Sequence, residues 1–384
     1  MHYIRLLRPP TIERGRGQAK LKVAFTINTD LSDAYLNPPT PVELCIIGAT
    51  VDPKGNANSP PVPVDLTQRS TPTWRAGMRV LKLELPLPLP LPPITTIQIR
   101  PRSRLLTALA AADIYPQMQP LILPVYADLV APDAPEAPEH LCFRSLRLPG
   151  GDPSAPPATL QVEEEMGESM ARHVWDGGIT AACFLADMCL GSASPSNQSP
   201  MPVLSSILRQ SEPLSVVEVG CGVGTLGVGL ARLLGPSSHV LLTDLPDAEA
   251  RARANIARGA SHTACSVDFE SLDWEDGKDG NFGPKVQSRK WDLVVLSDCT
   301  YNVDSMPLLV QTLSALHAHN SQQCTSASLE SKVLLATKQR HSTEKVAFDL
   351  LAAGGWLIQE QTSVTLPCVG SETQSVEVYL LSKA

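Results

Sequence analysis

The sequence predicts an α/β fold, in which a doubly wound sheet follows a small β extension rich in proline. From about residue 215, short apolar runs alternate with segments of helical spacing, as in a parallel sheet covered by helices. One of these apolar runs leads directly into a glycine-rich turn. Most of the 35 prolines lie before residue 160. We therefore expect a proline-rich, mainly β region over residues 1–140 and an α/β domain over residues 141–384.

The N-terminal region carries strand-like runs separated by turn and proline clusters. These runs cover residues 21–28, 42–49, 80–85 and 94–100. Residues 85–93 repeat Leu-Pro, and proline has no backbone N–H to donate to a central strand. We expect polyproline II geometry on the surface there, serving as a stiff spacer rather than as a docking site for a partner.

The second part alternates in the order required for a Rossmann-like doubly wound sheet of seven strands. A helix is expected over residues 178–190, before the sheet begins. The strands expected next are 215–219, 239–243, 263–267, 291–297 and 333–337, with helices at 225–234, 247–258, 305–317 and 342–353. Residues 356–361 and 375–381 follow as a C-terminal antiparallel hairpin.

Composition excludes several classes of protein. The chain has 384 residues, 43% of them hydrophobic, with no apolar run long enough to span a membrane and no signal-like N-terminus. A net charge of −8 argues against nucleic-acid binding, and we interpret the acidic trio 163–165 as a solvated face. Nine cysteines without a CxxC pair indicate a reducing compartment, so we expect the cytoplasm and possibly the nucleus. The oligomeric state stays open.

The glycine-rich turn predicts a nucleotide-type cofactor site. Gly220, Gly222 and Gly224 allow positive φ angles and a close approach of the backbone to a ligand. The turn also satisfies GxGxxG, and Asp244 lies about 20 residues further on, as in a nicotinamide-dependent dehydrogenase. Against that hypothesis, Glu218 places a carboxylate two residues before the first glycine. It could reach a cationic ligand such as the methionine moiety of S-adenosylmethionine.

Polar residues follow the other expected strands at the same edge of the sheet. Asp244 could accept both ribose hydroxyls, or instead cap the next helix. Asp268 or Asp273 could accept the adenine amino group, while Trp274 covers either the ring or only the core. Ser297 ends the fourth strand and leads into Asp-Cys-Thr-Tyr. Because ligands in such sheets bind outside the carboxyl ends of the strands, these residues are candidates for one site.

An ordered set of motifs resembles the seven-β-strand methyltransferases, and within them a fungal-like member of the protein-lysine methyltransferase branch with an Asp-x-x-Tyr motif. The motifs are Val174–Gly178, Glu218–Gly224, Thr243–Asp244, Leu272–Trp274, Ser297–Asn302 and Lys338–His341. The similarity spans about residues 140–384 and none of the proline-rich region. It implies that Trp175 and Asp244 lie beside S-adenosylmethionine, and that Asp298 and Tyr301 lie beside the acceptor.

The chemistry of methyl transfer suits these residue types. The reaction is an in-line displacement, so the protein mainly has to align the attacking lone pair. A lysine amine with a pKa of about 10.4 must lose a proton before it attacks. Asp298 could orient the amine, and Tyr301 could hold it by its hydroxyl or ring face. We expect transfer to a lysine of a protein, with a small-molecule amine methyltransferase or a non-catalytic adaptor as alternatives.

Other polar residues are assigned structural roles. Arg340, His341 and Glu344 could line a substrate channel, but a helix entry is the favoured interpretation. His317 and His319 could form only part of a metal site, so we expect no bound metal.

Overall fold

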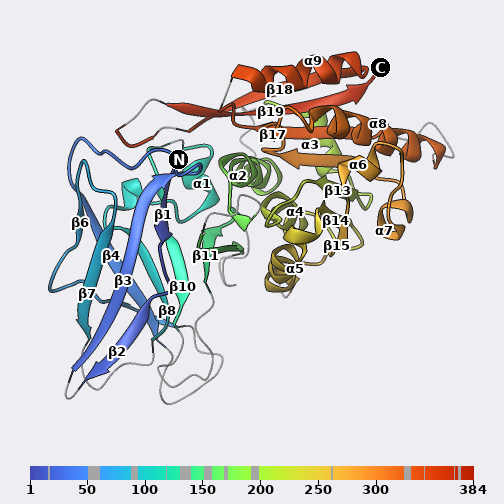
Figure 1. Ribbon diagram of the computed structural model, residues 1–384. Coiled ribbons are helices and arrows are strands. Elements are labelled where there is room, and N and C mark those ends of the chain that lie inside the picture. Colours follow the sequence, from blue (N-terminus) through green and yellow to red (C-terminus); the bar gives the residue numbers. More distant parts are fainter. Residues whose placement is uncertain are drawn as a thin grey trace.

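The computed structural model describes most of the chain (Figure 1). The residues it describes are 1–15, 18–50, 61–87, 94–117, 119–129, 140–150, 158–167, 172–191, 199–260, 263–323, 330–340, 342–366, 368–370 and 373–384.

The C-terminal part is built on one seven-stranded sheet, and it confirms the expected α/β class. The strands follow in the spatial order β15-β14-β13-β16-β17-β19-β18. The first five run parallel, and the last two form an antiparallel hairpin that pairs with β17. Their bounds are β13 Ser215–Val219, β14 His239–Asp244, β15 Ser266–Ser271, β16 Leu293–Ser297, β17 Lys332–Thr337, β18 Trp356–Leu366 and β19 Gln374–Lys383.

Helices cover both faces of this sheet because successive strand residues point to opposite sides. Val216 and Val240 pack with helices α2 and α4, whereas Val217 and Leu241 pack with α8 and α9 in a separate core. The helices are α2 Asp176–Leu190, α3 Pro202–Leu208, α4 Thr225–Ala231, α5 Pro246–Ala260, α6 Trp274–Gly277, α7 Pro284–Gln287, α8 Met306–Gln322 and α9 Val346–Ala353, with the 3₁₀ turn η3 at Ser342–Lys345.

The third strand lies three to four residues later than the sequence predicts. We expected it at residues 263–267, but β15 begins at Ser266, opposite His239. The hydroxyl of Thr263 accepts a hydrogen bond from the amide of Cys265, forming a turn before the strand. The apolar pattern alone could not show where pairing with β14 starts.

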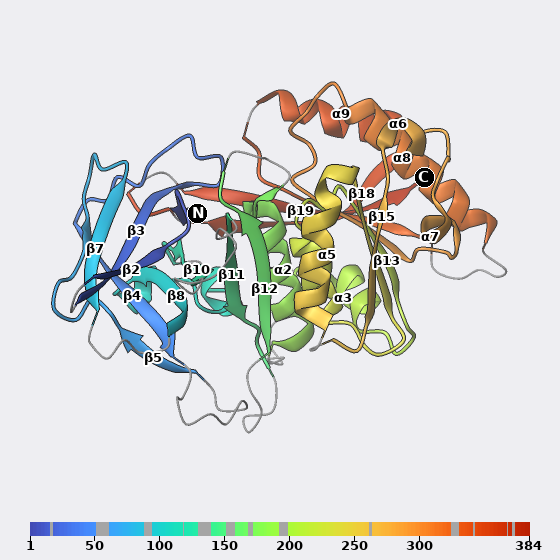
Figure 2. The ribbon, with the colours of Figure 1, turned by 60° about the horizontal axis from the view of Figure 1, so that its bottom comes forward.

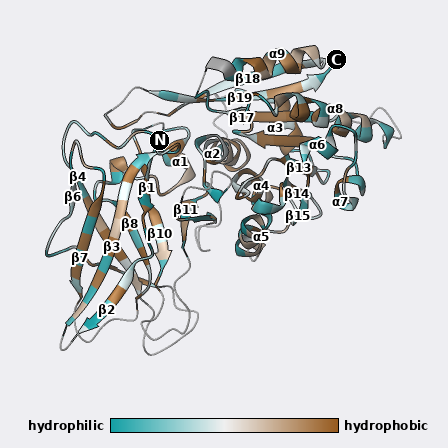
Figure 3. Ribbon diagram, in the orientation of Figure 1, coloured by the Kyte–Doolittle hydropathy of each residue, from teal (hydrophilic) through white to brown (hydrophobic). Residues whose placement is uncertain are grey.

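The N-terminal part is a sandwich of two sheets, larger than the small extension that the sequence suggests. One sheet has the order β2-β3-β1-β9 with β7 beside β3, and the other β12-β11-β10-β8-β4-β5 with β6 beside β4. Figure 3 shows hydrophilic and hydrophobic residues along β3; exposed and buried residues alternate in its first part, as expected for a strand with one face on a core, and the rest is buried on both faces. The elements are β1 His2–Leu6, β2 Thr11–Gly15, β3 Gln18–Thr29, β4 Val42–Thr50, β5 Val62–Asp65, β6 Thr73–Trp74, β7 Leu81–Leu87, β8 Ile94–Pro101, η1 Arg104–Leu106, α1 Ala111–Ile114, β9 Ile122–Leu123, β10 Val125–Asp128, β11 Leu141–Arg147 and β12 Thr159–Glu165.

All four runs predicted in this region are strands, but the Leu-Pro repeat is not wholly polyproline II. Its first residues belong to β7, where Pro86 lies opposite Lys20 of β3. A proline fits there because β7 has no second neighbour in the described sheet, so its missing N–H is not needed. Residues 88–93 lie outside the described part of the chain.

The domain boundary that we expected at residue 140 would divide a sheet. Strands β11 and β12 lie beyond it, yet β11 pairs with β10 of the N-terminal sandwich. Figure 2 shows β12 at the edge of that sheet, on the side that faces helix α5. The acidic trio is also not a solvated face: Glu164 is buried in an ion pair with Arg144, and Glu163 pairs with Arg251 and Arg258 of α5.

The two parts share a continuous core. Met1 and Tyr3 of the sandwich belong to the same buried cluster as Phe184 of α2 and Leu366 of β18. Figure 1 shows the β18–β19 hairpin reaching toward the sandwich, with the N-terminus between the two parts. Within the described residues, no helix is both long and apolar enough to span a membrane.

Candidate functional site

A cavity of about 350 Å³ opens at the carboxyl ends of strands β13, β14 and β16. Such crevices hold the ligand in open α/β sheets. It brings together most of the residues that the sequence singles out: Trp175, Gly220, Gly222, Asp244, Asp273, Trp274, Ser297, Asp298 and Tyr301. Glu218 and Gly224, which we also expected to contact a cofactor, do not line it.

The glycine turn after β13 forms one wall of the cavity. Gly220, Gly222 and Gly224 have φ angles of 70°, 54° and 80°, values that favour glycine. A Cβ atom on Gly220 would lie 2.7 Å from the sulfur of Cys299, and one on Gly224 would lie 2.8 Å from Leu242. Gly224 therefore allows the turn to pack closely against Leu242, whereas Gly220 and Gly222 expose their backbone to the cavity.

Asp244 links the glycine turn to strand β14. Its Oδ2 accepts the amide of Gly222 at 2.7 Å, and its Oδ1 accepts the amide of Leu245 at 2.7 Å. Burial raises the pKa of this carboxyl, and the two amide hydrogen bonds offset only part of that effect. Each oxygen keeps a second lone pair, so the carboxylate could accept a pair of vicinal hydroxyls.

Glu218 lies beneath the cavity rather than in it. The side chain is fully buried, and Oε2 accepts the amide of Gly227 at 2.9 Å in the first turn of α4. Burial raises the pKa of Glu218 to about 8, and this hydrogen bond offsets only part of the shift. Our prediction that Glu218 contacts a cationic ligand directly is therefore wrong, because its side chain does not line the cavity. Instead, Glu218 supports the turn that faces the cavity.

The opposite wall comes from the residues after β15. Asp273 and Trp274 line the cavity, and Asp273 also caps α6 by accepting the amide of Glu275. Asp268, the other candidate, lies inside β15 and pairs with Lys285 at 2.6 Å. The later start of β15 removes Asp268 from the strand end and leaves Asp273 there.

Asp298 is a buried junction between three elements. Its φ is 52°, and its carboxylate accepts the amides of Gly177 at 2.6 Å and Lys338 at 3.1 Å. The guanidinium of Arg340 lies 3.0 Å from Oδ1. Asp298 therefore fixes the start of α2 and the end of β17 at the cavity wall.

Arg340 is a cavity residue, contrary to the helix-entry role that the sequence favoured. It lies over the ring of Trp175, 5.1 Å from the centroid, and it pairs with Asp298 and with Asp30 of the N-terminal part. Burial acts to lower the pKa of Arg340, but the two carboxylates outweigh it and raise the pKa. Glu344 accepts the amide of Arg340, and His341 lies outside the described residues.

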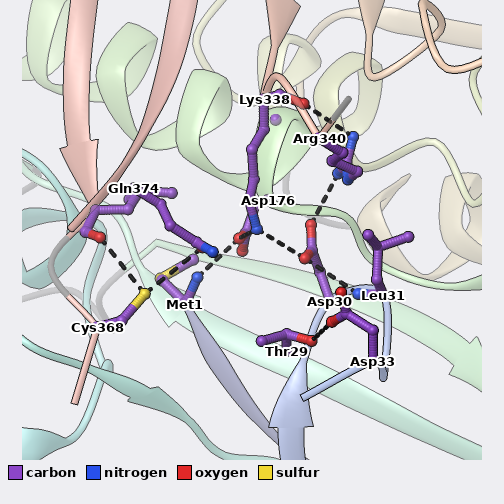
Figure 4. Close-up of polar contacts among 12 residues, drawn as sticks. Met1, Thr29, Asp30, Leu31, Asp33, Asp176, Lys338, Arg340, Cys368 and Gln374 are labelled. Carbon is purple, nitrogen blue, oxygen red and sulfur yellow. Dashed lines mark hydrogen bonds and ion pairs between the residues drawn. The ribbon is translucent and has the colours of Figure 1, made fainter. Parts of the chain in front are cut away.

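Lys338 connects the same wall to α2 and to the N-terminal part, as Figure 4 shows. Its ammonium lies 2.8 Å from Asp30 and 2.7 Å from Asp176, and all three side chains are buried. Burial acts to lower the pKa of Lys338, but the carboxylates of Asp176 and Asp30 raise it overall. Asp176 also accepts the hydroxyl of Tyr3 at 2.6 Å.

The mouth of the cavity is open and carries three exposed apolar or aromatic side chains, beside the exposed polar residues Asp273 and Asn302. Tyr301 is 57% exposed, Leu245 is 48% exposed and Leu31 is 42% exposed, and all three line the cavity. Tyr301 was expected here, since it closes the Asp-x-x-Tyr motif. Leu31 and Asp30 carried no sequence signal, while Arg340 stood within a motif that we had already noted. No group of three or more metal-ligating side chains occurs in the described part of the chain.

The fold and cavity together define a class: an α/β protein with a ligand-sized cavity where the strand order reverses. A sequence profile described as lysine methyltransferase matches residues 154–353, just over half of the chain. The chain belongs to this lysine methyltransferase family.

Two relatives and one solved structure match parts of the chain. A UPF0665 family protein of Schizosaccharomyces pombe is 26% identical over 263 residues, covering 68% of this chain and 66% of that protein. EEF1A lysine methyltransferase 3 of Xenopus tropicalis is 35% identical over 136 residues, covering 35% of this chain and 53% of that protein. The crystal structure of TrmN from Thermus thermophilus aligns with 49% of each chain at 18% identity and a TM-score of 0.32.

Proposed function

We propose that the chain transfers a methyl group from S-adenosylmethionine to a lysine side chain of a protein. One observation carries the proposal: in a member of this family, a single cavity joins the glycine turn and Asp244 to the motif of Asp298 and Tyr301. The residues present suit the cofactor. Gly220 and Gly222 line the cavity without side chains, and Asp244 can accept ribose hydroxyls.

When bound, S-adenosylmethionine supplies an electrophilic methyl group on a sulfonium centre. Gly220, Gly222 and Asp244 would hold it from the β13 and β14 side, with Asp273 and Trp274 around the adenine and Ser297 and Trp175 completing the wall. Glu218 would act indirectly, by keeping the glycine turn in place through Gly227.

The acceptor half would align a neutral amine at the other end of the cavity. The exposed ring and hydroxyl of Tyr301 can hold the amine and guide its lone pair. The carboxylate of Asp298 already accepts two amides and pairs with Arg340, so it suits electrostatic orientation better than proton abstraction. The open mouth lets the proton leave to water.

The open, apolar mouth favours a protein acceptor over a small amine. A small amine would be enclosed for specificity, whereas exposed Leu31, Leu245 and Tyr301 can pack against residues that flank a lysine. EEF1A, the acceptor in the name of the Xenopus relative, is the first protein to test.

Calorimetry with S-adenosylhomocysteine and transfer of a labelled methyl group test the proposal. We expect wild type to bind the cofactor product, and Asp244→Ala to weaken binding roughly a hundredfold because it removes two ligand acceptors. Asp247→Ala on the exposed start of α5 is the matched control. Wild type without binding would overturn the proposal. Binding combined with no transfer to EEF1A or any protein of a soluble extract would favour the adaptor.

A further inference from the structure

A tight turn of the N-terminal sandwich reaches the acceptor end of the cavity. Directly after β3, the amide of Thr29 donates to the carbonyl of Ala34 at 3.0 Å, and the amide of Ser32 donates to Thr29 at 3.0 Å. Ser32 has a φ of 61°, so the turn is sharply bent. At its tip, the side chain of Leu31 lines the cavity that otherwise belongs to the C-terminal part.

Asp30 fastens this turn to the C-terminal part from a buried position. It is only 3% exposed, and its two carboxylate oxygens lie 2.8 Å from the ammonium of Lys338 and 2.8 Å from the guanidinium of Arg340. Figure 4 shows both cations converging on Asp30, with Leu31 beside it. The guanidinium of Arg5 also donates to the Asp30 carbonyl at 3.0 Å, so the backbone of the turn is held as well.

The contacts continue from Asp30 into the proposed catalytic motif. Arg340 places one nitrogen on Asp30 and the other on Asp298, while its guanidinium lies over Trp175. Because the guanidinium is a rigid planar fork, an anchor on one nitrogen limits the positions available to the other. The position of Asp30 therefore restricts the orientation of the Asp298 carboxylate at the cavity wall.

We propose that the Asp30–Leu31 turn is the N-terminal region's contribution to acceptor recognition, with Leu31 contacting an apolar residue next to the target lysine. Asp30 is a positioning residue that acts on Asp298 through Arg340. This inference rests on the proposed function. It makes the sandwich part of the site, since Leu31 joins Leu245 and Tyr301 in one apolar mouth drawn from both parts of the chain.

The apolar character of the mouth decides the chemistry of the contact. Near Leu31, the carboxylates of Asp30, Asp176 and Asp298 are all paired with cations of the chain. They have little charge left to attract a basic segment. Among the exposed residues that line the cavity, Asp273 and Asn302 are polar, whereas Leu31, Leu245 and Tyr301 offer hydrocarbon and ring, which pack best against an apolar neighbour of the acceptor lysine.

Leu31→Ala is the first test, with Leu7→Ala as the matched control. Leu7 is an exposed leucine of the same sandwich, 49% exposed, and it does not line the cavity. With EEF1A, or the soluble-extract protein that wild type labels, we expect Leu31→Ala to raise the acceptor KM roughly tenfold. The kcat, the affinity for S-adenosylhomocysteine and the Tm should stay at wild-type values. Leu7→Ala should change none of the four.

Asp30→Asn is the second test, with Asp33→Asn as its control in the same turn. Asp33 is exposed and accepts the hydroxyl of Thr29 instead of contacting the buried cations. We expect Asp30→Asn to lower kcat roughly tenfold, with the affinity for S-adenosylhomocysteine unchanged. A purely structural role would instead lower the Tm and the cofactor affinity together. If Asp30→Asn does not fold, Leu31→Ala alone decides the inference.

The outcomes separate this inference from the proposed function. Wild type that binds no cofactor, or transfers no methyl group to protein, overturns the proposed function and this inference with it. An active wild type with unchanged kcat and KM in Leu31→Ala overturns this inference alone. A fall in cofactor affinity in Leu31→Ala would also contradict it, because Leu31 would then serve the cofactor end.

Discussion

Replacing Glu218 by glutamine tests whether this carboxyl is a buried support of the glycine turn. Its pKa rises from an ordinary 4.5 to about 8 on folding, because burial disfavours the charged form. Between those values the folded state binds more protons than the unfolded state, so this group's stabilising contribution is present at low pH and lost as pH rises. Glutamine matches the protonated acid in shape and does not titrate.

The size of the effect follows from linkage. A shift of about 3.5 pKa units corresponds to about 5 kcal/mol between pH 4.5 and 8, or about 1.4 kcal/mol per pH unit inside that range. Between pH 5.5 and 7.5, Glu218→Gln should therefore gain about 3 kcal/mol relative to wild type. With an unfolding entropy of about 2.1 cal/mol/K per residue, this changes the Tm difference by roughly 3 °C.

The assay is thermal unfolding of wild type and Glu218→Gln at several pH values in that window. The difference in Tm between the two proteins should move steadily in favour of the variant as pH rises. Glu84→Gln is the control, because Glu84 is exposed and its pKa is lowered by Lys20, so it titrates below the window. If plots of Tm against pH run parallel for Glu218→Gln and wild type, the result refutes both the raised pKa of Glu218 and the buried position that causes it.

Three further pairs of substitutions separate the roles of other residues. Gly177→Ala should lower methyl transfer more than tenfold, because its Cβ would lie 2.6 Å from the Asp298 carboxyl. The control Gly235→Ala, with open space around its Cβ, should transfer at the wild-type rate. A normal rate in Gly177→Ala would contradict the role of the contact between Gly177 and Asp298. Tyr301→Phe should keep part of the transfer activity if the ring holds the amine. Tyr301→Ala should lose at least tenfold in kcat/KM, with unchanged affinity for S-adenosylhomocysteine. Equal activity in wild type and both variants would show that Tyr301 does not belong to the acceptor site. Glu164→Gln should destabilise the protein by about 3 kcal/mol in denaturant unfolding, because Arg144 would stay buried without its ion pair. The control Glu165→Gln, whose partner Arg172 is more exposed, should change the stability by less than about 1 kcal/mol. Similar losses in both variants would argue against the buried pair.

The strands of the C-terminal sheet could be predicted because their signal is local. Strand β13 is mostly apolar, with three valines among its five residues, and it ends at a glycine turn, so both its position and its role follow from neighbouring residues. The start of β15 could not be predicted in this way, since it depends on pairing with β14 rather than on its own apolar run. That shift explains why Asp273, and not Asp268, lies at the cavity.

The parts of the site that sequence reasoning missed depend on long-range contacts. Asp30 and Arg340 stand 310 positions apart, and nothing in the local pattern of either residue indicates the other. The buried state of Glu164 has the same origin, because its partner Arg144 comes from a neighbouring strand that we had placed near a boundary. Motif spacing identified many of the residues that face the cavity, but not Leu31, and not which carboxylates would be paired beneath its surface.

The most direct test of the central claim is transfer of a labelled methyl group from S-adenosylmethionine to protein, followed by mass spectrometry of the labelled site. Wild type should place the label on a lysine side chain of EEF1A or of one protein in a soluble extract, and Asp244→Ala should abolish the label. Label found only on small amines, or no cofactor-dependent label on any protein, would contradict the claim that this cavity methylates a protein lysine.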